Sequence, residues 1–271
     1  MRHLVVHTIV MSSAGAFFSR ATQWTAPSVS LRFHGNLNFF LAPAHRETEF
    51  VHTAGPTDTV KHVIESLGVP HTEIEGVTVN GQPVTLAAQL SDGDHVEVFP
   101  YTEPIALEDP RFVVDGHLGR LAAYLRMLGF DTWYDRYADD ALLASIASHE
   151  NRVLLTRDVG LLKRREIECG YCVRGDKPHG QLPEIASRFA LYSKFAPFER
   201  CMDCNGRLYP VAKQEIEHLL PPHTRETKHE FSRCSNCSKV FWRGSHYSRM
   251  LGWIEALRDD KDPRQVMKED R

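Results

Sequence analysis

The sequence predicts an α/β domain with a parallel sheet, placed between a small β-rich domain and a cysteine-rich module. From Arg111 onward, short apolar runs alternate with helical periods, which is typical of a parallel sheet with flanking helices. Aspartates follow one apolar run after another, and two Cys-x-x-Cys pairs come after the last of these runs. A chain of 271 residues is long enough for one large domain or a few small ones.

The composition is ordinary for a soluble globular protein, with 42% hydrophobic and 25% charged residues. A net charge of −3 gives no overall basic surface, which weakens the case for strong non-specific DNA binding but still allows a local basic patch. We expect no membrane-spanning segment, because no apolar run is long enough to cross a bilayer.

Residues 1–27 show no sustained period, and we interpret them as a disordered leader. Their first part has one arginine, a short apolar run and small residues, as a signal peptide does, but His7 interrupts the apolar run. An unstructured leader or an upstream start codon is the interpretation that we prefer.

Residues 28–102 predict a small domain whose elements follow the order β-β-α-β-β. Thr59 lies where it can cap the helix, Gly68 can end it, and Asn80-Gly81 is a hairpin signal. The predicted segments are a strand at 29–33, an apolar segment within 36–50, a helix over 60–67, strands around 77–79 and 84, and a closing strand at 95–99.

This order, together with the segments GVPHTEI and SDGDHVEVFP, resembles the β-grasp, ubiquitin-like sulfur carriers of thiamin and molybdopterin synthesis. Those carriers end in a free Gly-Gly, whereas here the strand ends in Phe99-Pro100-Tyr101 and the chain continues. We therefore expect docking of a protein partner rather than carrier chemistry. Residues 28–104 hold three basic and ten acidic residues, a net of −7, so this domain should not grip a phosphate backbone. A packing domain with a solvated acidic surface remains the alternative.

After a linker at 103–110, the central domain is predicted over 111–195. Its strands are expected at 112–114, 131–134, 153–155 and 170–174, and its helices at 118–128, from Asp139 or Asp140 to Ala147, and from near Pro183 to Phe189.

Three aspartates, Asp115, Asp158 and Asp176, each follow a predicted strand, and Asp139 and Asp140 open the helix between the first two. Parallel strands bring their carboxyl ends to one edge, where gathered carboxylates repel one another unless a hard cation holds them. Mg²⁺ or Mn²⁺ prefers such ligands and can activate water for phosphodiester hydrolysis. For Asp139 or Asp140 alone, helix capping would be the simpler interpretation.

The segments VDGHLGRLAAYLRMLGFDT, YADD, LLTRD, LLKRR and GYCVRGD closely resemble the Mut-seven C-terminal RNase domain, a branch of the PIN nuclease superfamily. The resemblance implies a PIN-like fold, Mg²⁺ or Mn²⁺ as cofactor and single-stranded RNA as substrate. It implies Asp115, Asp139 and Asp158 as the main acids, with Asp140 as a competing choice for the second and Asp176 as a fourth.

Several cations are candidates for phosphate contacts. They are Arg120, Arg157, Lys163, Arg164 and Arg165. The run Lys163–Arg165 can equally be a solvated helix face. Thr156 resembles the small hydroxyl residue that precedes the third acid in many PIN domains. We leave His117 out of the site, because a metal site can generate its own hydroxide.

Residues 196–252 predict a zinc ribbon, since Cys201, Cys204, Cys234 and Cys237 can supply four thiolates in tetrahedral geometry. Such a closed site is structural, and its thiolates favour a reducing cytoplasm. Cys169 and Cys172 are expected to stay outside it. Trp242 and Arg243 mix an aromatic with positive charge and could bind unpaired bases, although for Trp242 a place in the ribbon core is an equal alternative.

The segment FWRGSHYSRM also matches the family, whose ribbon follows the nuclease domain, and residues 253–271 are expected to be a charged tail. The leading interpretation is a PIN-type ribonuclease with a zinc ribbon and a docking module. The alternative is a non-catalytic RNA- or ribosome-associated adaptor, and a weaker one is a toxin-like nuclease controlled by a partner.

Overall fold

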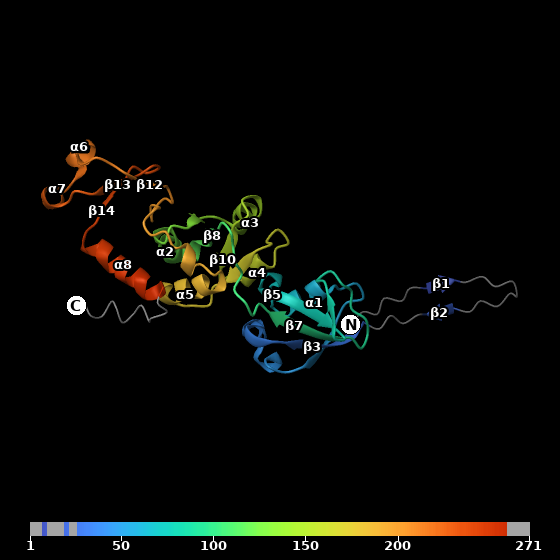
Figure 1. Ribbon diagram of the computed structural model, residues 1–271. Helices are drawn as coiled ribbons and strands as arrows, with labels where there is room; N and C mark the ends of the chain where they lie inside the picture. The colour runs from blue at the N-terminus through green and yellow to red at the C-terminus, as the bar shows by residue number, and fades with distance from the viewer. Residues whose placement is uncertain (1–6, 10–18, 22–25, 259–271) are drawn as a thin grey trace. The chain divides into compact units, whose positions relative to one another are not determined.

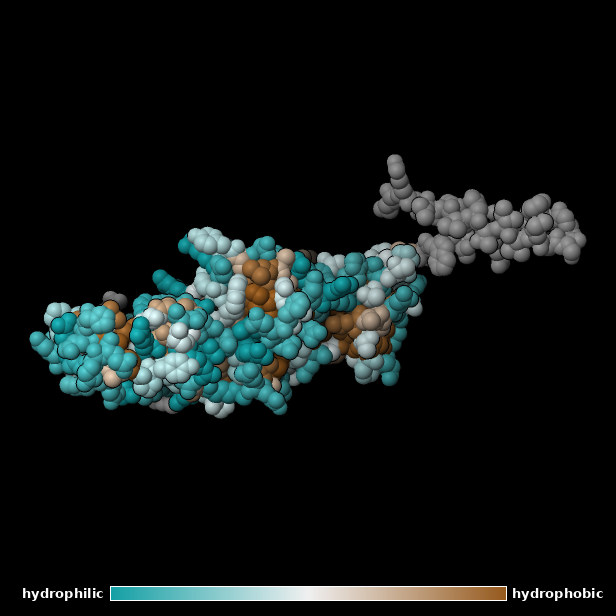
Figure 2. Space-filling view, turned by 90° about the horizontal axis from the view of Figure 1, so that it is seen from above, coloured by the Kyte–Doolittle hydropathy of each residue, from teal (hydrophilic) through white to brown (hydrophobic). Residues whose placement is uncertain are grey.

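The computed structural model describes residues 7–9, 19–21 and 26–258 (Figure 1). The chain divides into two compact units, one comprising Met1–Val69 and Ile74–Pro100 and the other Pro70–Glu73 and Tyr101–Arg271. Within the part of the chain described, no helix is long and apolar enough to cross a membrane. Figure 2 shows a face on which hydrophilic residues predominate and hydrophobic residues gather in separate patches.

The first unit is a five-stranded sheet with one α-helix, which confirms the ubiquitin-like fold. The strand order is β4-β3-β7-β5-β6, and β3 and β7 run parallel while the other neighbours are antiparallel. The elements are β3 (Ser28–Phe33), β4 (Phe50–Thr53), α1 (Val60–Ser66), β5 (Ile74–Val79), β6 (Gln82–Val84) and β7 (His95–Pro100).

Local sequence signals explain how these elements begin and end. The Thr59 hydroxyl accepts a hydrogen bond from the His62 amide at the start of α1, and Gly68 takes a positive φ of 107° after the helix. Asn80 and Gly81 both have positive φ, 52° and 77°, as the tight turn between β5 and β6 requires.

The segment 36–50 differs from the expected apolar element. It forms two 3₁₀ turns, η1 (Gly35–Phe40) and η2 (Pro43–His45), and the strand β4 begins only at Phe50. The side-chain Nδ2 of Asn38 donates to the backbone carbonyls of Phe33 and Gly35 and so fixes the first turn. β4 is an edge strand without a fully buried residue, which is why its periodicity gave no signal.

Within the predicted leader 1–27, β1 (His7–Ile9) pairs antiparallel with β2 (Ser19–Ala21). Residues 1–6, 10–18 and 22–25 lie outside the described residues, so the leader remains a prediction there.

The second unit is built on a parallel four-stranded sheet of order β11-β10-β8-β9, which confirms the predicted α/β class. Its core gathers Phe112, Leu121, Leu125 and Phe189, all with 0% exposure. The elements are β8 (Arg111–Val114), η4 (Gly116–Leu118), α2 (Gly119–Met127), β9 (Asp131–Tyr134), α3 (Asp140–His149), β10 (Val153–Thr156), α4 (Val159–Leu162), β11 (Gly170–Cys172) and α5 (Pro178–Arg188).

Two of these bounds differ from expectation. β11 ends at Cys172 rather than at Arg174, and α5 begins at Pro178, before the start expected near Pro183. Proline is tolerated in the first turn of a helix, and Pro178 occupies that place, while Pro183 lies inside the helix. The predicted linker is also part of this unit, since the Ile105 amide donates to the Arg188 carbonyl and Leu107 packs against the core.

The cysteine-rich region forms an antiparallel sheet of order β12-β13-β14. These strands are β12 (Leu208–Pro210), β13 (Phe231–Cys234) and β14 (Val240–Trp242). The long spacer between the two Cys-x-x-Cys pairs contains α6 (Lys213–Ile216), η6 (Glu217–Leu219) and α7 (Pro222–Thr227). Ile216 and Leu220 pack on Phe231, so the insertion has a small core of its own.

The last helix, α8 (Ser245–Arg258), corrects the expectation that a charged tail begins at 253. Trp253, Ile254 and Leu257 are buried in the core of the second unit, at 4%, 1% and 3% exposure. These apolar residues recur at helical spacing, and the charged run that sets in at Arg258 led to a boundary placed five residues too early. Residues 259–271 lie outside the described part of the chain.

Candidate functional site

A cavity of about 910 Å³ lies next to the carboxyl ends of the parallel strands. Four of the five aspartates proposed from the sequence line it, namely Asp115, Asp140, Asp158 and Asp176. They come from four separate places in the chain, after β8, at the start of α3, after β10 and after β11. The fold therefore brings these carboxylates to one cavity, as parallel strands are expected to do.

Asp115 and Asp158 are linked by the hydroxyl of Thr156, which is fully buried at 0% exposure. The hydroxyl donates to Asp115 Oδ2 at 2.6 Å and accepts from the Asp158 amide at 2.9 Å. Asp115 also accepts from the His117 amide at 3.2 Å. A single side chain at the end of β10 thus fixes one carboxylate and the backbone of the next.

The turn after Asp115 depends on two glycines. A Cβ at Gly116 would lie 2.6 Å from the Arg136 carbonyl oxygen, and a Cβ at Gly119 would lie 2.5 Å from the Tyr134 hydroxyl. That hydroxyl donates to the Gly116 carbonyl at 3.0 Å. Close approach of β9 and the chain that follows it therefore explains the sequence Asp-Gly-His-Leu-Gly.

Asp158 has a structural role besides its place in the cavity. Its Oδ1 accepts from the amides of Gly160 at 2.7 Å and Leu161 at 3.3 Å, which caps the short helix α4. Its side chain is nevertheless exposed and lines the cavity, so capping and ligand binding are compatible.

The structure separates the two adjacent aspartates at the start of α3. Asp139 is the N-cap, and its carboxylate accepts from the Leu142 amide at 2.8 Å. Asp140, the next residue, lines the cavity, whereas Asp139 does not. The geometry therefore brings Asp140 to the acids and leaves Asp139, the expected main acid, in the role of a helix cap.

Asp176 is an exposed acid, with 87% of its side chain accessible. Its Oδ1 accepts from Arg157 Nη2 at 2.9 Å. Both residues line the cavity, so an anion entering it would compete with Asp176 for this guanidinium.

The cations proposed from the sequence fall into two groups. Arg120 and Arg157 line the cavity, whereas Lys163, Arg164 and Arg165, which follow α4, do not. Arg164 pairs with Glu166 at 3.6 Å. Sequence reasoning missed three polar side chains of the lining, Tyr134, Arg136 and Gln181, and it left out His117, which also lines the cavity.

The donor set fits a hydrated divalent ion. Carboxylate oxygens suit Mg²⁺ or Mn²⁺, and Mg²⁺ usually keeps several waters. Among the residues that the structure describes, one group of three or more His, Cys, Asp or Glu residues has its possible ligand atoms all within 4.8 Å of one another, and it consists of Cys201, Cys204, Cys234 and Cys237. The four acids are more widely spaced, so water would have to complete the coordination of an ion in this cavity.

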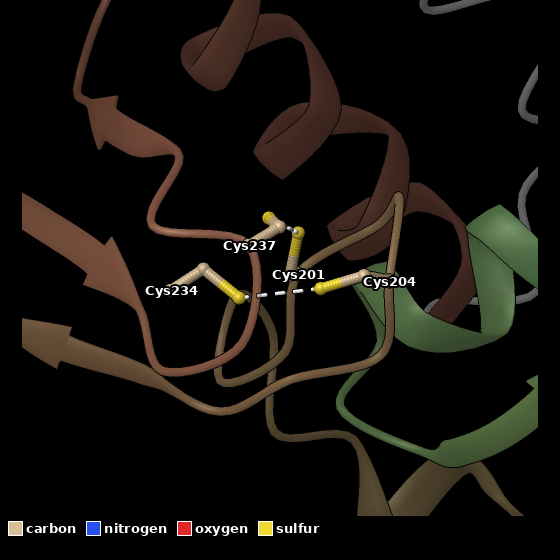
Figure 3. A group of neighbouring side chains, drawn as sticks. All are labelled: Cys201, Cys204, Cys234 and Cys237. Carbon is tan, nitrogen blue, oxygen red and sulfur yellow. Dashed lines mark hydrogen bonds between the residues drawn. The ribbon is translucent and has the colours of Figure 1, made fainter.

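The four cysteines of the ribbon come together as the spacing predicts (Figure 3). The sulfurs of Cys201 and Cys237 are 3.8 Å apart, and those of Cys204 and Cys234 are 3.3 Å apart. Tetrahedral Zn–S bonds of about 2.3 Å place sulfurs about 3.8 Å from one another, so the cluster has the dimensions of a zinc site. Burial raises the pKa of Cys201 to about 12, which a bound cation would reverse.

The other two cysteines lie elsewhere. Cys172 is buried in β11, and burial, with the charge of Glu73 adding to it, raises the pKa of its thiol to about 11. Burial also raises the pKa of Cys169.

A second cavity, of about 780 Å³, is lined by residues of the ribbon and α8 that include Trp242, Arg243 and Tyr247. The Tyr247 and Phe198 rings are 4.4 Å apart, and the Arg243 guanidinium lies 5.6 Å from the Tyr247 ring centre. Arg243 also pairs with Glu230 at 3.1 Å. Trp242 is 36% exposed, so of its two interpretations the structure favours an accessible ring over a core position.

Comparison with known protein families gives two matches. A family model described as the Mut7-C RNAse domain matches residues 110–254, more than half of the chain. A second, described as Mut7-C ubiquitin, matches residues 26–106. The two matches confirm the resemblance and the order of the domains. A search of curated proteins and a search of solved structures find no match.

Proposed function

Because the chain belongs to the Mut7-C RNase domain family, we propose that it is a metal-dependent ribonuclease that hydrolyses phosphodiester bonds in single-stranded RNA. Membership of this family supports a nuclease-type role. One structural observation supports the proposal that the hydrolysis depends on a bound metal ion. Four carboxylates from separate strand and helix ends line one cavity, and Thr156 links two of them.

Asp115, Asp140 and Asp158 would hold Mg²⁺ or Mn²⁺ partly through water, with Asp176 as a further acid. Such an ion supplies an activated water and stabilises the leaving oxygen. Thr156 holds the Asp115 carboxylate in place through its 2.6 Å hydrogen bond. Tyr134 and the two glycines of the turn set where that carboxylate lies relative to the others.

The cations that line the cavity are suited to the phosphates of the substrate. Arg120, Arg136 and Arg157 offer guanidinium groups there, and planar guanidinium groups bind phosphate oxygens in pairs. Arg157 is the one whose present partner, Asp176, is itself an exposed acid of the cavity. Lys163, Arg164 and Arg165 would contact RNA only beyond the cavity.

The ribbon would hold unpaired nucleotides next to the nuclease domain. The accessible Trp242 ring can stack on a base, and the exposed Arg243 can meet a phosphate once it leaves Glu230. An exposed ion pair of this kind contributes little to stability, so releasing it costs little. The four cysteines would bind a structural zinc, and their thiolates suit a reducing compartment, in keeping with a cytoplasmic location.

The ubiquitin-like domain would dock a protein partner. Its excess of acidic residues, ten against three basic ones over 28–104, argues against a direct role in RNA binding.

One observation favours a second candidate, a non-catalytic adaptor that binds RNA or the ribosome. Asp158 caps α4, and Asp176 pairs with Arg157, so both acids have structural partners without an ion. In such an adaptor the acids would serve the fold alone.

The two adjacent aspartates at α3 give a sharp test. Purified protein is incubated with labelled single-stranded RNA and Mn²⁺ or Mg²⁺, alongside Asp140→Asn and Asp139→Asn. Asparagine caps a helix as well as aspartate does, so Asp139→Asn changes only a charge outside the cavity. We expect Asp140→Asn to lose cleavage and Asp139→Asn to keep it. The reverse result would refute the assignment of the second acid. Absence of cleavage by the unmodified protein on single-stranded RNA would favour the adaptor.

A further inference from the structure

The edge strand β9 of the nuclease sheet is held by the cysteine ribbon at its start and touches the acid cavity at its end. Within the described sheet it has one strand neighbour, β8. On the side of β9 that faces the ribbon, the Asn205 side chain occupies the place where a second neighbouring strand would pair with β9. Its Oδ1 accepts from the Thr132 amide at 3.1 Å, and its Nδ2 donates to Asp131 Oδ1 at 2.8 Å.

Arg126 completes this attachment. Its guanidinium Nε donates to the Thr132 carbonyl at 2.9 Å, and its Nη1 donates to the carbonyls of Met202 at 3.2 Å and Asp203 at 2.7 Å. Those two residues lie between Cys201 and Cys204, so Arg126 joins β9 to the peptides of the first cysteine knuckle. The side chain is only 5% exposed. A four-thiolate zinc site carries net negative charge, and a buried guanidinium beside it compensates part of that charge.

Asp131 adds a charged part to the same junction. It pairs with Arg152 at 2.8 Å and with Arg200 at 3.3 Å. Burial alone would raise the pKa of Asp131, but hydrogen bonds from Arg152 and Asn205 and the charges of both arginines outweigh burial and hold the pKa below its usual range. The acid therefore stays ionised and keeps both guanidinium groups in place.

The other end of β9 reaches the candidate site. Tyr134 lies two residues beyond Thr132, and its hydroxyl donates to the Gly116 carbonyl at 3.0 Å. Gly116 follows Asp115 directly, and Gly119 has no room for a Cβ against the Tyr134 ring. A chain of contacts thus runs from the cysteine knuckle through Asn205, Thr132 and Tyr134 to the turn that carries the first acid.

We propose that the metal-bound ribbon is a positioning element of the nuclease site, with Asn205 as its positioning residue. Occupancy of the four-cysteine site fixes the knuckle, the knuckle fixes β9, and Tyr134 then fixes the turn after Asp115. The consequence for catalysis rests on the proposed ribonuclease function, whereas the mechanical link is independent of it. Loss of zinc would therefore weaken ion binding in a cavity to which no cysteine contributes.

The chain offers a matched pair of variants for the test. Asn205 and Ser238 each follow the second cysteine of a knuckle, and both have positive φ, 68° and 61°. Glycine suits positive φ, so Asn205→Gly and Ser238→Gly remove a side chain without adding backbone strain. Only Asn205 bonds to β9. Tyr134→Phe breaks the other end of the chain without touching the ribbon.

Three measurements on the full chain decide the proposal: zinc content, Mn²⁺ affinity by titration calorimetry, and hydrogen exchange of the amides at 115–119. In Asn205→Gly we expect zinc to be retained, Mn²⁺ to bind about tenfold more weakly and exchange at 115–119 to become faster, because outer residues orient the ligands of a metal site. Ser238→Gly should match the unmodified protein. Where RNA is cleaved, kcat should fall more than KM rises.

A double variant tests whether the effect travels through β9. If it does, Asn205→Gly combined with Tyr134→Phe should weaken Mn²⁺ binding no more than the worse single change does. Unchanged Mn²⁺ affinity and exchange in Asn205→Gly, with zinc retained, would overturn the proposal, as would full additivity of the two changes. If the unmodified protein cleaves no RNA while exchange responds as expected, the ribonuclease function fails and the mechanical link stands.

Discussion

Replacing Thr156 by valine removes the hydroxyl that links Asp115 to Asp158 and keeps the shape of the side chain. The lost hydrogen bond to the Asp115 carboxylate contributes roughly 1.5–3 kcal/mol, and the Asp158 amide loses its acceptor, which costs a further 1–3 kcal/mol or so when water cannot replace it. Asp115 is only half-buried and Asp158 is exposed, so water recovers part of this sum. We expect a net loss of about 3 kcal/mol.

A loss of that size lowers the melting temperature of the second unit by about 6–12 °C. The Asp115 carboxylate is also released from its position, so we expect kcat/KM for RNA cleavage to fall about 10- to 100-fold. Differential scanning calorimetry and a cleavage assay with Mn²⁺ measure the two effects. Thr156→Ser keeps the hydroxyl and serves as the control, with nearly full activity. Equal losses in the serine and valine variants would refute the reasoning, because the serine variant keeps the hydroxyl and loses only the methyl group.

Three further predictions concern the turn, the junction and the ribbon. Gly119→Ala places a Cβ 2.5 Å from the Tyr134 hydroxyl, so we expect a stability loss of roughly 1–3 kcal/mol together with weaker Mn²⁺ binding. Calorimetry measures both effects. A variant as stable as the unmodified protein would contradict the close approach. Asp131→Asn leaves the buried Arg152 short of a counter-charge and should cost about 2–3 kcal/mol at neutral pH. The pKa of Asp131 is lower in the folded than in the unfolded chain, so its contribution to stability is present above a pH of about 4 and is lost as pH falls through the folded pKa. In urea unfolding, the difference in free energy of unfolding between the variant and the unmodified protein should therefore shrink below about pH 4. A difference that persists there would exclude the charge of Asp131 as its source. Cys234→Ser should abolish zinc in metal analysis of the reduced protein and lower the melting temperature of the second unit, whereas retained zinc would refute the four-cysteine assignment.

The sequence predicted those parts of the fold that depend on local periodicity and short motifs. The alternating strands of the ubiquitin-like domain, the parallel sheet and the two cysteine pairs all follow from neighbouring residues. The strand β4 and the helix α8 were placed wrongly, because an edge strand without buried residues gives no clear periodicity and the helix runs directly into a charged segment.

Local sequence patterns also predicted some residues of the candidate site and left others undecided. Asp115, Asp158 and Asp176 could be placed in one cavity because each follows a strand of a parallel sheet. Nothing in the sequence separates Asp139 from Asp140, since both residues can cap a helix and only the backbone direction at α3 decides which one does.

Contacts between distant segments were beyond sequence reasoning. In the sequence, Arg126 has no feature beyond its place in a predicted helix, and Asn205 has none beyond its place in a turn. Their hydrogen bonds to Thr132 depend on how the ribbon packs against β9. Tyr134 likewise reads as a strand residue, and its bond to Gly116 appears only once the sheet is formed. The glycines of the turn carried an indirect signal, because two glycines three residues apart after a strand indicate a close approach.

The most direct test of the central claim is RNA cleavage by the unmodified protein and by Asp115→Asn, measured against Mn²⁺ concentration on single-stranded RNA. The claim predicts cleavage that requires the ion and a fall of about a hundredfold or more in Asp115→Asn. Equal cleavage by both proteins, or cleavage that persists after the divalent ion is removed, would contradict it.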